Sequence, residues 1–356
     1  EVVAAPTAAP AAPAASVKSS DYFFTKSGET YTQLTTKDVS SNTKIVMDRA
    51  ITSNLSITAT KEVTLYVEIP STFTESPFKG TESTAIDVTV GSNVTLVVDD
   101  QRAKVTNNNT FAYVNLIVNE NGTVFFEQPT GSTGTFFYYK NVGGALTIDG
   151  GKLYMHCNGL QVSKLELKNK AQLNWESFSD KACTQINGLP CISMTQDSSI
   201  DATSSMNVVD GARVWANGAT LTVSGNLDAE FHIFGTNDKL TVAEGGSFSG
   251  KAFTKSGADI TYSKLVLNGS GTNGATVSMD STSHNLVLGG EVEDSSISAV
   301  NTAGLTYATG TTKGSTVKDL TANNLAVAAD SEFTVAKGTT LEATTAITVE
   351  AGAVLN

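Results

Sequence analysis

A short motif recurs along the chain and constrains its fold more than any other feature. It reads apolar residue, any residue, Val, two further residues, Gly, two further residues and a second apolar residue, and it is clearest at 240–248, 333–341 and 347–355. The alternating apolar residues predict a short strand with one buried face, and the glycine supplies a bend. Because so small a unit cannot bury its own face unless copies stack, the motif predicts an all-β fold, a parallel right-handed β-solenoid (β-helix).

Composition divides the chain into three segments. Residues 1–17 form an Ala/Pro-rich tail, which its three prolines favour as an extended polyproline II segment. Residues 18–140 form an aromatic-rich β region that we expect to be more globular. Residues 141–356 carry the Gly-punctuated motif and form the predicted solenoid. We expect a single elongated body.

The charge of the chain limits its partners. Of 356 residues only 16% are charged, the formal net charge is -12, and three residues are Arg. An anionic chain without clustered Lys and Arg is unsuited to nucleic acid. No run of about 18 apolar residues occurs, so no membrane span is predicted. Glu1 followed by an Ala/Pro tract resembles the remnant of a cleaved signal peptide, which predicts a secreted, extracellular or cell-surface protein.

Two features fit an oxidising compartment. Cys183 and Cys191 enclose a short loop and predict a disulfide, which leaves Cys157 as a buried apolar side chain. The alternative, three reduced core cysteines, stays open. Five sequons permit N-glycosylation, although several are expected by chance in a chain rich in Asn, Ser and Thr: Asn54, Asn93, Asn108, Asn121 and Asn268.

The search for a catalytic site yields one candidate set, Asp99, Asp100 and Arg102. Paired carboxylates serve glycoside hydrolysis, but Asp also favours the turn that follows a strand, and we prefer this second interpretation. His156 and His232 alternate with apolar residues in strand-like segments, and no Cys/His spacing of a zinc site occurs. We therefore predict a protein that is not an enzyme and that has no metal and no cofactor.

Aromatic residues offer a possible glycan site. Tyr138, Tyr139, Trp175 and Trp215 could stack on sugar rings if they were exposed. Both tryptophans lie in strand-like segments, however, so packing in the core is the preferred interpretation.

The motif is similar to the strand-Gly-strand rungs of secreted right-handed β-helix surface proteins. These include bacterial adhesin passengers and yeast cell-wall adhesins of the hyphally regulated type. The resemblance covers residues 141–356 and implies an exported, surface-located protein without enzymatic activity. It carries over no functional residue.

The end of the sequence suggests a mode of assembly. The chain stops within its motif, and three explanations compete: a fragment of a longer protein, an end blunted by its own loops, or a last rung that docks on the first rung of another copy. The third predicts a subunit junction made by Val2, Val3, Ile347, Val349, Val354 and Leu355.

We therefore expect a structural subunit of an extracellular filament or surface layer, with other copies of itself as partner. The alternatives are an adhesin domain that binds surface glycans and, third, a polysaccharide lyase or hydrolase.

Overall fold

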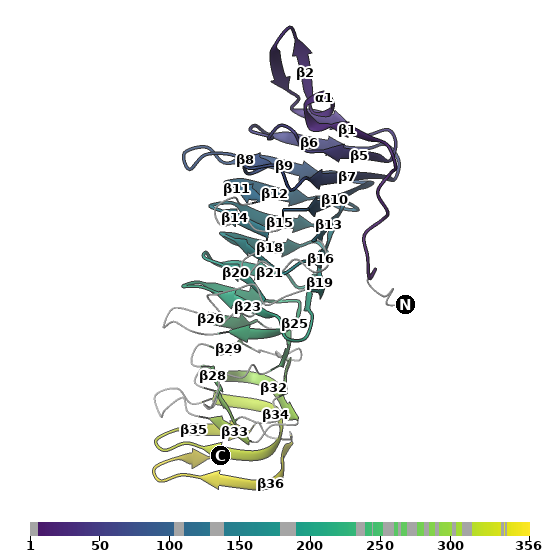
Figure 1. Cartoon of the computed structure of the whole chain (residues 1–356). Helices are drawn as coiled ribbons and strands as arrows, with labels where there is room; N and C mark the ends of the chain where they lie inside the picture. The colour runs from purple at the N-terminus through teal and green to yellow at the C-terminus, as the bar shows by residue number, and fades with distance from the viewer. Residues whose placement is uncertain are drawn as a thin grey trace. The chain divides into compact units, whose positions relative to one another are not determined.

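The protein is an all-β molecule with large parallel sheets, and 57% of its residues are in strands (Figure 1). The prediction of an all-β chain is thereby confirmed. The computed structural model describes residues 6–102, 110–128, 139–178, 190–232, 239–243, 245–251, 260–262, 265–268, 276–280, 285–288, 292–300, 304–307, 315–335, 338 and 340–356. Among these residues no helix is long and apolar enough to cross a membrane.

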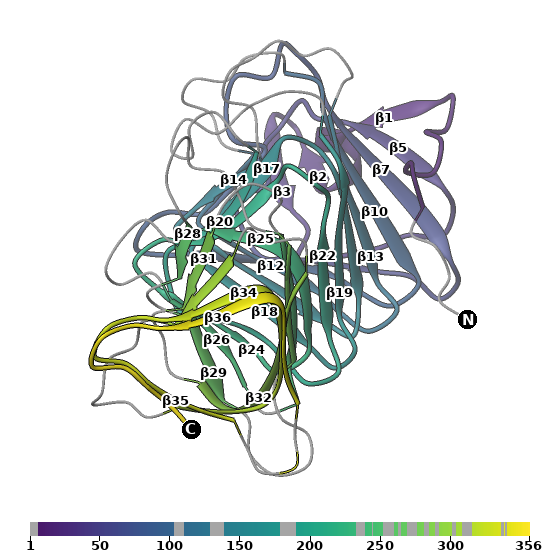
Figure 2. The same ribbon diagram turned by 90° about the horizontal axis from the view of Figure 1, so that it is seen from below.

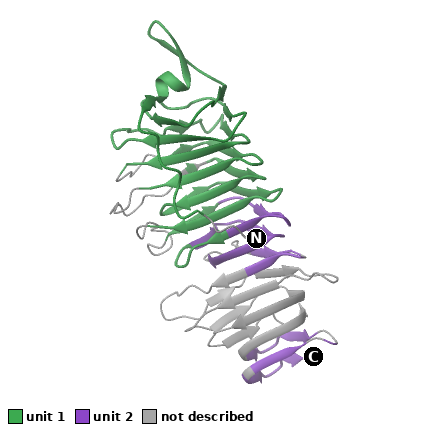
Figure 3. Ribbon diagram, turned by 90° about the vertical axis from the view of Figure 1, so that its right-hand side faces the viewer, with its two compact units in different colours: residues 1–194, 207–212 green, residues 195–206, 213–356 purple. Residues whose placement is uncertain are grey.

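The chain divides into two compact units (Figure 3). Unit 1 comprises residues 1–194 and 207–212, and unit 2 comprises residues 195–206 and 213–356. The three segments expected from composition remain a prediction as domains. The elements of unit 1 are β1 (Ser16–Lys18), α1 (Ser19–Tyr22), β2 (Phe24–Ser27), β3 (Thr30–Gln33), β4 (Thr36–Asp38), β5 (Thr43–Val46), β6 (Leu55–Thr58), β7 (Val63–Ile69), β8 (Phe78–Lys79), β9 (Ile86–Val90), β10 (Val94–Asp100), β11 (Phe111–Ala112), β12 (Val114–Val118), β13 (Thr123–Glu127), β14 (Tyr139–Val142), β15 (Ala145–Asp149), β16 (Lys152–His156), β17 (Gly159–Val162), β18 (Lys164–Lys168), β19 (Gln172–Ser177) and β20 (Cys191–Met194).

Strands of unit 1 pair in parallel with strands of the next turn of chain. Sheet A contains β1, β5, β7, β10, β13, β16 and β19. Sheet B contains β8, β11, β14, β17 and β20. Sheet C contains β4, β6, β9, β12, β15 and β18. Three consecutive strands, such as β10–β12, thus form a layer that pairs with the next three, β13–β15; Figure 2 shows β5, β7, β10 and β13 side by side.

The core of unit 1 lies between the sheets because alternate residues of each strand point inward. In β7 the pattern alternates strictly between buried and half-buried residues. Aromatic rings fill the interior near sheet B: Phe126 stacks on Tyr139 with ring centroids 4.2 Å apart, and Phe78 stacks on Phe111 at 5.3 Å. The Tyr139 hydroxyl donates to a backbone carbonyl, since a buried hydroxyl needs a partner.

The first layer of unit 1 carries an insertion. The short helix α1 and the antiparallel hairpin β2–β3 lie between β1 and β4 in the chain. Asp48 holds α1 in place by accepting hydrogen bonds from the Ser19 hydroxyl (3.0 Å) and from the Ser20 hydroxyl (2.8 Å). Phe23, which follows α1, is fully buried. A large apolar side chain therefore closes the core next to the first layer.

Unit 2 repeats the parallel pattern. Its strands are β21 (Ser198–Ile200), β23 (Arg213–Ala216), β24 (Thr220–Val223), β25 (Asn226–His232), β26 (Lys239–Val242), β27 (Ser247–Lys251), β28 (Ile260–Tyr262), β29 (Leu265–Asn268), β30 (Thr276–Asp280), β31 (Asn285–Leu288), β32 (Val292–Val300), β33 (Gly304–Tyr307), β34 (Ser315–Val327), β35 (Glu332–Val335), β36 (Leu341–Val349) and β37 (Val354–Leu355), while β22 (Ser205–Val208) is shared between the units. One series of parallel pairs runs β21, β24, β26, β29 and a second runs β25, β27, β30.

The last strands of unit 2 expose residues at inward positions. Ile347 pairs in register with Leu325, and Val349 pairs with Val327. Leu325 and Val327 are buried, whereas Ile347 and Val349 are exposed. The two exposed side chains therefore continue a buried row that no further described strand covers.

Candidate functional site

The outward face of sheet A carries three columns of side chains, because parallel strands in register place equivalent residues side by side. The threonine column consists of Thr64, Thr95, Thr123 and Lys152; the aromatic column consists of Tyr66, Val97, Phe125 and Tyr154; the acidic column consists of Glu68, Asp99, Glu127 and His156. All three run across β7, β10, β13 and β16. A ligand laid across these strands would meet similar groups at each step of about 4.8 Å.

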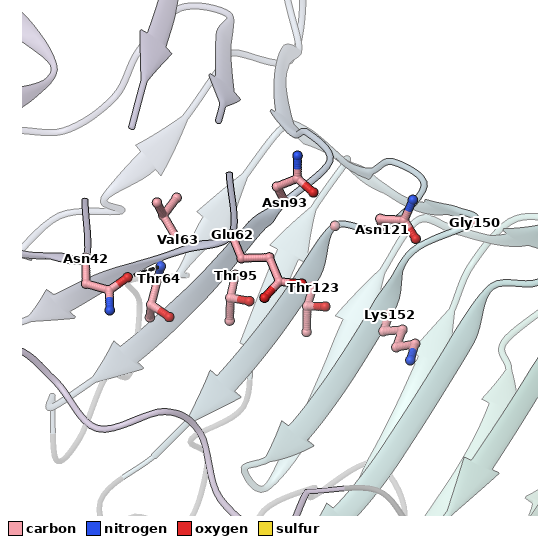
Figure 4. Close-up of a pocket in the computed structure, with 11 residues that line it drawn as sticks. Asn42, Glu62, Val63, Thr64, Asn93, Thr95, Asn121, Thr123, Gly150 and Lys152 are labelled. Atoms are coloured by element: carbon pink, nitrogen blue, oxygen red, sulfur yellow. Dashed lines mark hydrogen bonds between the residues drawn. The ribbon is translucent and has the colours of Figure 1, made fainter. Parts of the chain in front are cut away.

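A polar groove of about 570 Å³ lies along the threonine column (Figure 4). Its lining residues are Asn42, Glu62, Val63, Thr64, Asn93, Thr95, Asn121, Gly122, Thr123, Gly150 and Lys152. Asn93 and Asn121 occupy left-handed backbone conformations, with φ of 65° and 60°, which Asn tolerates better than most residues. Amide and hydroxyl side chains therefore gather at the point where the strands of sheet A begin.

The aromatic column lies beneath the N-terminal tail. Phe125 and Tyr154 stack with ring centroids 5.0 Å apart and planes inclined by 25°. Together with Val97 they form a buried apolar cluster, although all three point away from the core. Ala9 of the tail packs against this cluster. The tail thus covers the outward face of its own chain.

The acidic column is a hydrogen-bonded network. Asp99 accepts hydrogen bonds from the Tyr66 hydroxyl and from the side-chain amide of Gln101. Burial raises the pKa of Asp99, and the two hydrogen bonds offset this only in part. At the start of the column, Glu68 forms an ion pair with Lys44 at 2.7 Å.

His156 ends the acidic column. Its side chain is only 7% exposed, and its Nδ1 atom is paired with Glu127. Burial lowers the pKa of His156, but the hydrogen bond and charge of Glu127 outweigh burial and leave the pKa above its usual value, with a further contribution from the backbone of Pro6. The Nε2 atom is buried and makes no well-formed hydrogen bond within the described chain.

The structure separates Asp99 from the other two candidate catalytic residues, and it places Asp99 and Asp100 in β10 rather than in the turn that the preferred interpretation expected. Asp100 points into the core, where its carboxylate accepts hydrogen bonds from Arg102 at 2.6 and 2.8 Å and from the Thr110 hydroxyl at 2.9 Å. Asp99 is the preceding residue of the same strand and points outward. Asp100 and Arg102 form a buried structural ion pair, and the three residues do not converge on one site.

The aromatic residues considered as possible sugar-stacking residues are buried where they are described. Trp175, Trp215 and Tyr139 are buried, and the Trp175 indole donates to the backbone carbonyl of Cys157 at 2.9 Å. The preferred interpretation of the two tryptophans as packing residues is confirmed. Tyr138 lies outside the described residues.

The remaining predicted residues are placed only in part. Cys157 is buried, and burial raises its pKa to about 12, which makes it a poor nucleophile or metal ligand. Cys191 is buried, but Cys183 lies outside the described residues, so the disulfide stays a prediction. His284, Asn108, Val2 and Val3 also lie outside, as do the side chains of His232 and Asn268. The sequon residues Asn54 and Asn121 are exposed, and Asn93 is half-buried.

Sequence reasoning missed the three columns. Their signal was present in the repeated outward residues Tyr66, Phe125 and Tyr154. The lengths of the intervening loops concealed it, because successive strands of sheet A start 29 residues apart at β13 and β16 but 20 residues apart at β16 and β19.

Within the part of the chain that the structure describes, no group of three or more His, Cys, Asp or Glu residues is arranged to hold a metal ion. No protein-family model matches the chain, and neither the curated proteins nor the solved structures include a significant match.

Proposed function

We propose that this chain is an exported structural protein with a right-handed β-solenoid fold, and that copies stack head to tail into a filament or surface layer. The solenoid proposal is supported by the pairing of each layer of unit 1 with the next in parallel register.

One observation carries the proposal for assembly. The exposed large apolar side chains of the described chain are Val17 (41%), Ile347 (45%), Val349 (45%) and Val354 (43%). All four lie in β1, β36 or β37, which belong to the first layer of unit 1 and the last strands of unit 2. Val17 occupies an inward position, because it pairs with the buried Ile45. Val17 in β1 and Ile347 and Val349 in β36 are therefore exposed apolar side chains at inward positions, although Phe23 closes part of the core next to the first layer.

The strand edges at these ends support the same contact. In the described chain β1 pairs with β5 and β36 pairs with β34, so each keeps one edge without a partner strand. An open edge recruits another strand through its backbone groups. Burying each Val, Leu or Ile side chain would contribute about 1.5–3 kcal/mol, against the cost of lost translational and rotational freedom. Backbone pairing along the edge must supply the rest of the free energy of association.

The test is the assembly state of the purified chain. Over a concentration series, sedimentation and negative-stain microscopy should show linear particles. The double substitution Ile347→Asp and Val349→Asp should yield monomers, because carboxylates would enter the apolar contact. Thr348→Asp is the matched control, since Thr348 is also exposed and lies in the same strand but points to the other face. A chain that stays monomeric, or a double variant that assembles normally, contradicts the proposal.

The predicted part of Val2 and Val3 in the junction needs its own test. Deletion of residues 1–15 should abolish assembly if the tail belongs to the junction. Unimpaired assembly of this variant would remove Val2 and Val3 from the junction and leave the contact of β36 and β37 intact.

The structure gives less support to the two other functional hypotheses, the adhesin and the polysaccharide lyase or hydrolase. An adhesin that uses Trp175 and Trp215 would need exposed rings, and both are buried. A hydrolase that uses Asp99, Asp100 and Arg102 would need the three side chains to face one substrate, and they do not.

A further inference from the structure

We propose that the outward face of sheet A binds an extended neutral polysaccharide, and that the N-terminal tail competes with this ligand for the aromatic column. The site is the groove along the threonine column together with the aromatic and acidic columns beside it. The groove and the three columns lie in strands that take no part in the proposed junction, whereas the tail also carries Val2 and Val3 of that junction.

The groove favours a ligand rich in hydroxyl groups. Its lining combines hydroxyls of three threonines with side-chain amides of three asparagines, and it carries one carboxylate, Glu62, and one ammonium group, Lys152. Such groups both donate and accept hydrogen bonds. Because Thr64, Thr95 and Thr123 recur in register on successive strands, a polymer that crosses the strands meets an equivalent hydroxyl at each step. A repeating, extended ligand fits this arrangement better than a compact one.

The aromatic column supplies the apolar side of the site. Phe125, Tyr154 and Val97 form an apolar strip, which the apolar side of a sugar ring could cover in place of the tail. The strip is adjacent to the groove, because the threonine and aromatic columns are two residues apart in the same strands. In the present structure Ala9 occupies the strip.

The tail is a displaceable cover. Residues 6–15 form no strand and make no ladder of backbone hydrogen bonds with sheet A, and the prolines have no N–H to donate. Side-chain contacts such as that of Ala9 hold the tail, and most of its residues are exposed. A ligand that offers hydrogen bonds as well as apolar contact can therefore replace it.

Charge selects against acidic polymers. The acidic column places three carboxylates beside the strip, and the chain as a whole carries a net charge of -12. Carboxylates repel uronic acids and sulfated sugars but accept hydrogen bonds from neutral ones. The ligand class is accordingly a neutral polysaccharide.

The expected effect of the tail follows from competition. A ligand that needs the uncovered face binds with an affinity reduced by the fraction of molecules in which the face is uncovered. A tethered segment can compete even when its own contacts are weak, because its effective concentration reaches the millimolar range. Removing residues 1–15 should therefore strengthen binding by roughly five- to tenfold.

The experiment uses the full chain and the variant lacking residues 1–15, both produced in a bacterial cytosol so that the sequons carry no sugar. Isothermal titration calorimetry with cellohexaose, laminarihexaose and mannohexaose measures binding, and hexagalacturonate is the acidic control. We expect saturable binding of at least one neutral hexaose, tighter binding by the truncated chain, and no binding of hexagalacturonate.

Matched variants locate the site. Thr95→Val with Thr123→Val removes two groove hydroxyls without changing side-chain shape, and it should weaken binding by about tenfold or more. Thr147→Val is the control, because Thr147 is a half-buried, outward threonine in β15 of sheet C. Unchanged melting temperatures establish that the variants fold.

Failure of the truncated chain to bind any of the three neutral hexaoses overturns the site. Equal affinities of the full and truncated chains overturn the competition by the tail, and preference for hexagalacturonate overturns the argument from charge. A loss of binding in Thr147→Val equal to that of the groove variant would also overturn the assignment. The two chains are compared at concentrations at which sedimentation shows both to be monomers, so that a failure of binding is distinguished from a failure of assembly.

Discussion

Asp99 and Asp100 are adjacent in the sequence, yet they lie in opposite environments because side chains of a strand alternate between its faces. Asp100 lies in the core with Arg102, and neither side chain is more than 3% exposed. The guanidinium also donates to the backbone carbonyl of Glu75 at 3.0 Å, so most of its donors are satisfied. Such a pair is costly to break from one side, because the remaining charge is left buried and unpaired.

Substitution of one partner should therefore be strongly destabilising. Arg102→Met should lower the free energy of unfolding by about 3–5 kcal/mol. Lys164→Met is the control, because the ion pair of Lys164 with Glu166 is partly exposed and should contribute no more than about 1 kcal/mol. Urea unfolding followed by Trp175 fluorescence in a Trp215→Phe background measures both, since Trp175 lies in unit 1. Similar losses in the two variants would contradict the structural role of Arg102.

Asp99 should make stability depend on pH. Burial raises its pKa in the folded protein above the value of about 3.9 in the unfolded chain. Its contribution is then fully present below about pH 3.9 and is lost as the pH rises through the folded pKa. Asp99→Asn should consequently unfold at a higher urea concentration than the parent chain at pH 7, and the difference should vanish near pH 3.

Asp48 provides the opposite case. Burial acts to raise its pKa, but hydrogen bonds from Ser20 and Ser19 outweigh burial and leave the pKa lowered. Its stabilising contribution is present above the unfolded pKa and is lost as the pH falls through the folded value. Asp48→Asn should therefore be less stable than the parent chain at pH 7, with a loss that disappears in acid. If Asp99→Asn and Asp48→Asn changed the stability at pH 7 in the same direction, the environments described for the two carboxylates would be contradicted.

Single residues were predictable only where their local pattern decided the outcome. The alternation around Trp175 and Trp215 indicated packing, and both are buried. The partnership of Asp99 with Tyr66 was not predictable, because it depends on which residues of two layers come into register.

At the scale of elements, glycine positions show where layers approach most closely. A Cβ atom on Gly144, which precedes β15, would lie 2.2 Å from the backbone oxygen of Val114 in the preceding layer and 2.2 Å from the side-chain oxygen of Asn141. The Asn141 amide also donates to the same Val114 carbonyl at 2.6 Å. No room remains for a side chain at this turn.

Gly144→Ala should therefore lower the free energy of unfolding by at least about 3 kcal/mol, since the clash involves backbone of the adjacent layer. Gly28 in the β2–β3 hairpin is the control: its φ is +59°, but a Cβ atom would meet nothing within 4 Å. Gly28→Ala should cost only the left-handed backbone penalty, about 1–2 kcal/mol. The urea midpoints of the two variants in the Trp215→Phe background test this order.

The positions of strands were easier to predict than helix α1 or the packing of the tail. Apolar residues alternate in the segments 116–118 and 146–148, which lie in β12 and β15 and pair in register. Helix α1 was not predicted, because four residues are too few to show helical periodicity. The packing of the tail on sheet A was also missed, since Ala and Pro carry no signal that identifies the surface they contact.

For the whole molecule, net charge opposes assembly. Copies that carry -12 repel one another, and this repulsion is screened within about 10 Å at 0.1 M salt and about 3 Å at 1 M salt. If apolar side chains make the proposed junction, the concentration needed for assembly should fall as NaCl rises from 0.1 to 1 M. Sedimentation at several salt concentrations measures the protein concentration needed for assembly. If this concentration rose with salt, charge pairs would hold the junction instead.

Parallel stacking was predictable at this scale because the motif requires neighbours to bury its apolar face. The two compact units and the insertion at the first layer were not, since neither changes the local alternation of residues.

The register of sheet A makes the number of layers an adjustable property of unit 1. Thr95 pairs with Thr123 of the next layer. Thr123 pairs in turn with Lys152, which lies 29 residues after Thr123 in the chain. Excision of residues 123–151 would bring Lys152 opposite Thr95 and Leu165 opposite Leu116, with every retained side chain on its original face. Excision of one residue fewer would shift the register by one residue and move the inward side chains of the following strand to its outward face. Deletion or duplication of a whole layer could therefore shorten or extend such a protein during evolution without reversing the faces of the remaining strands.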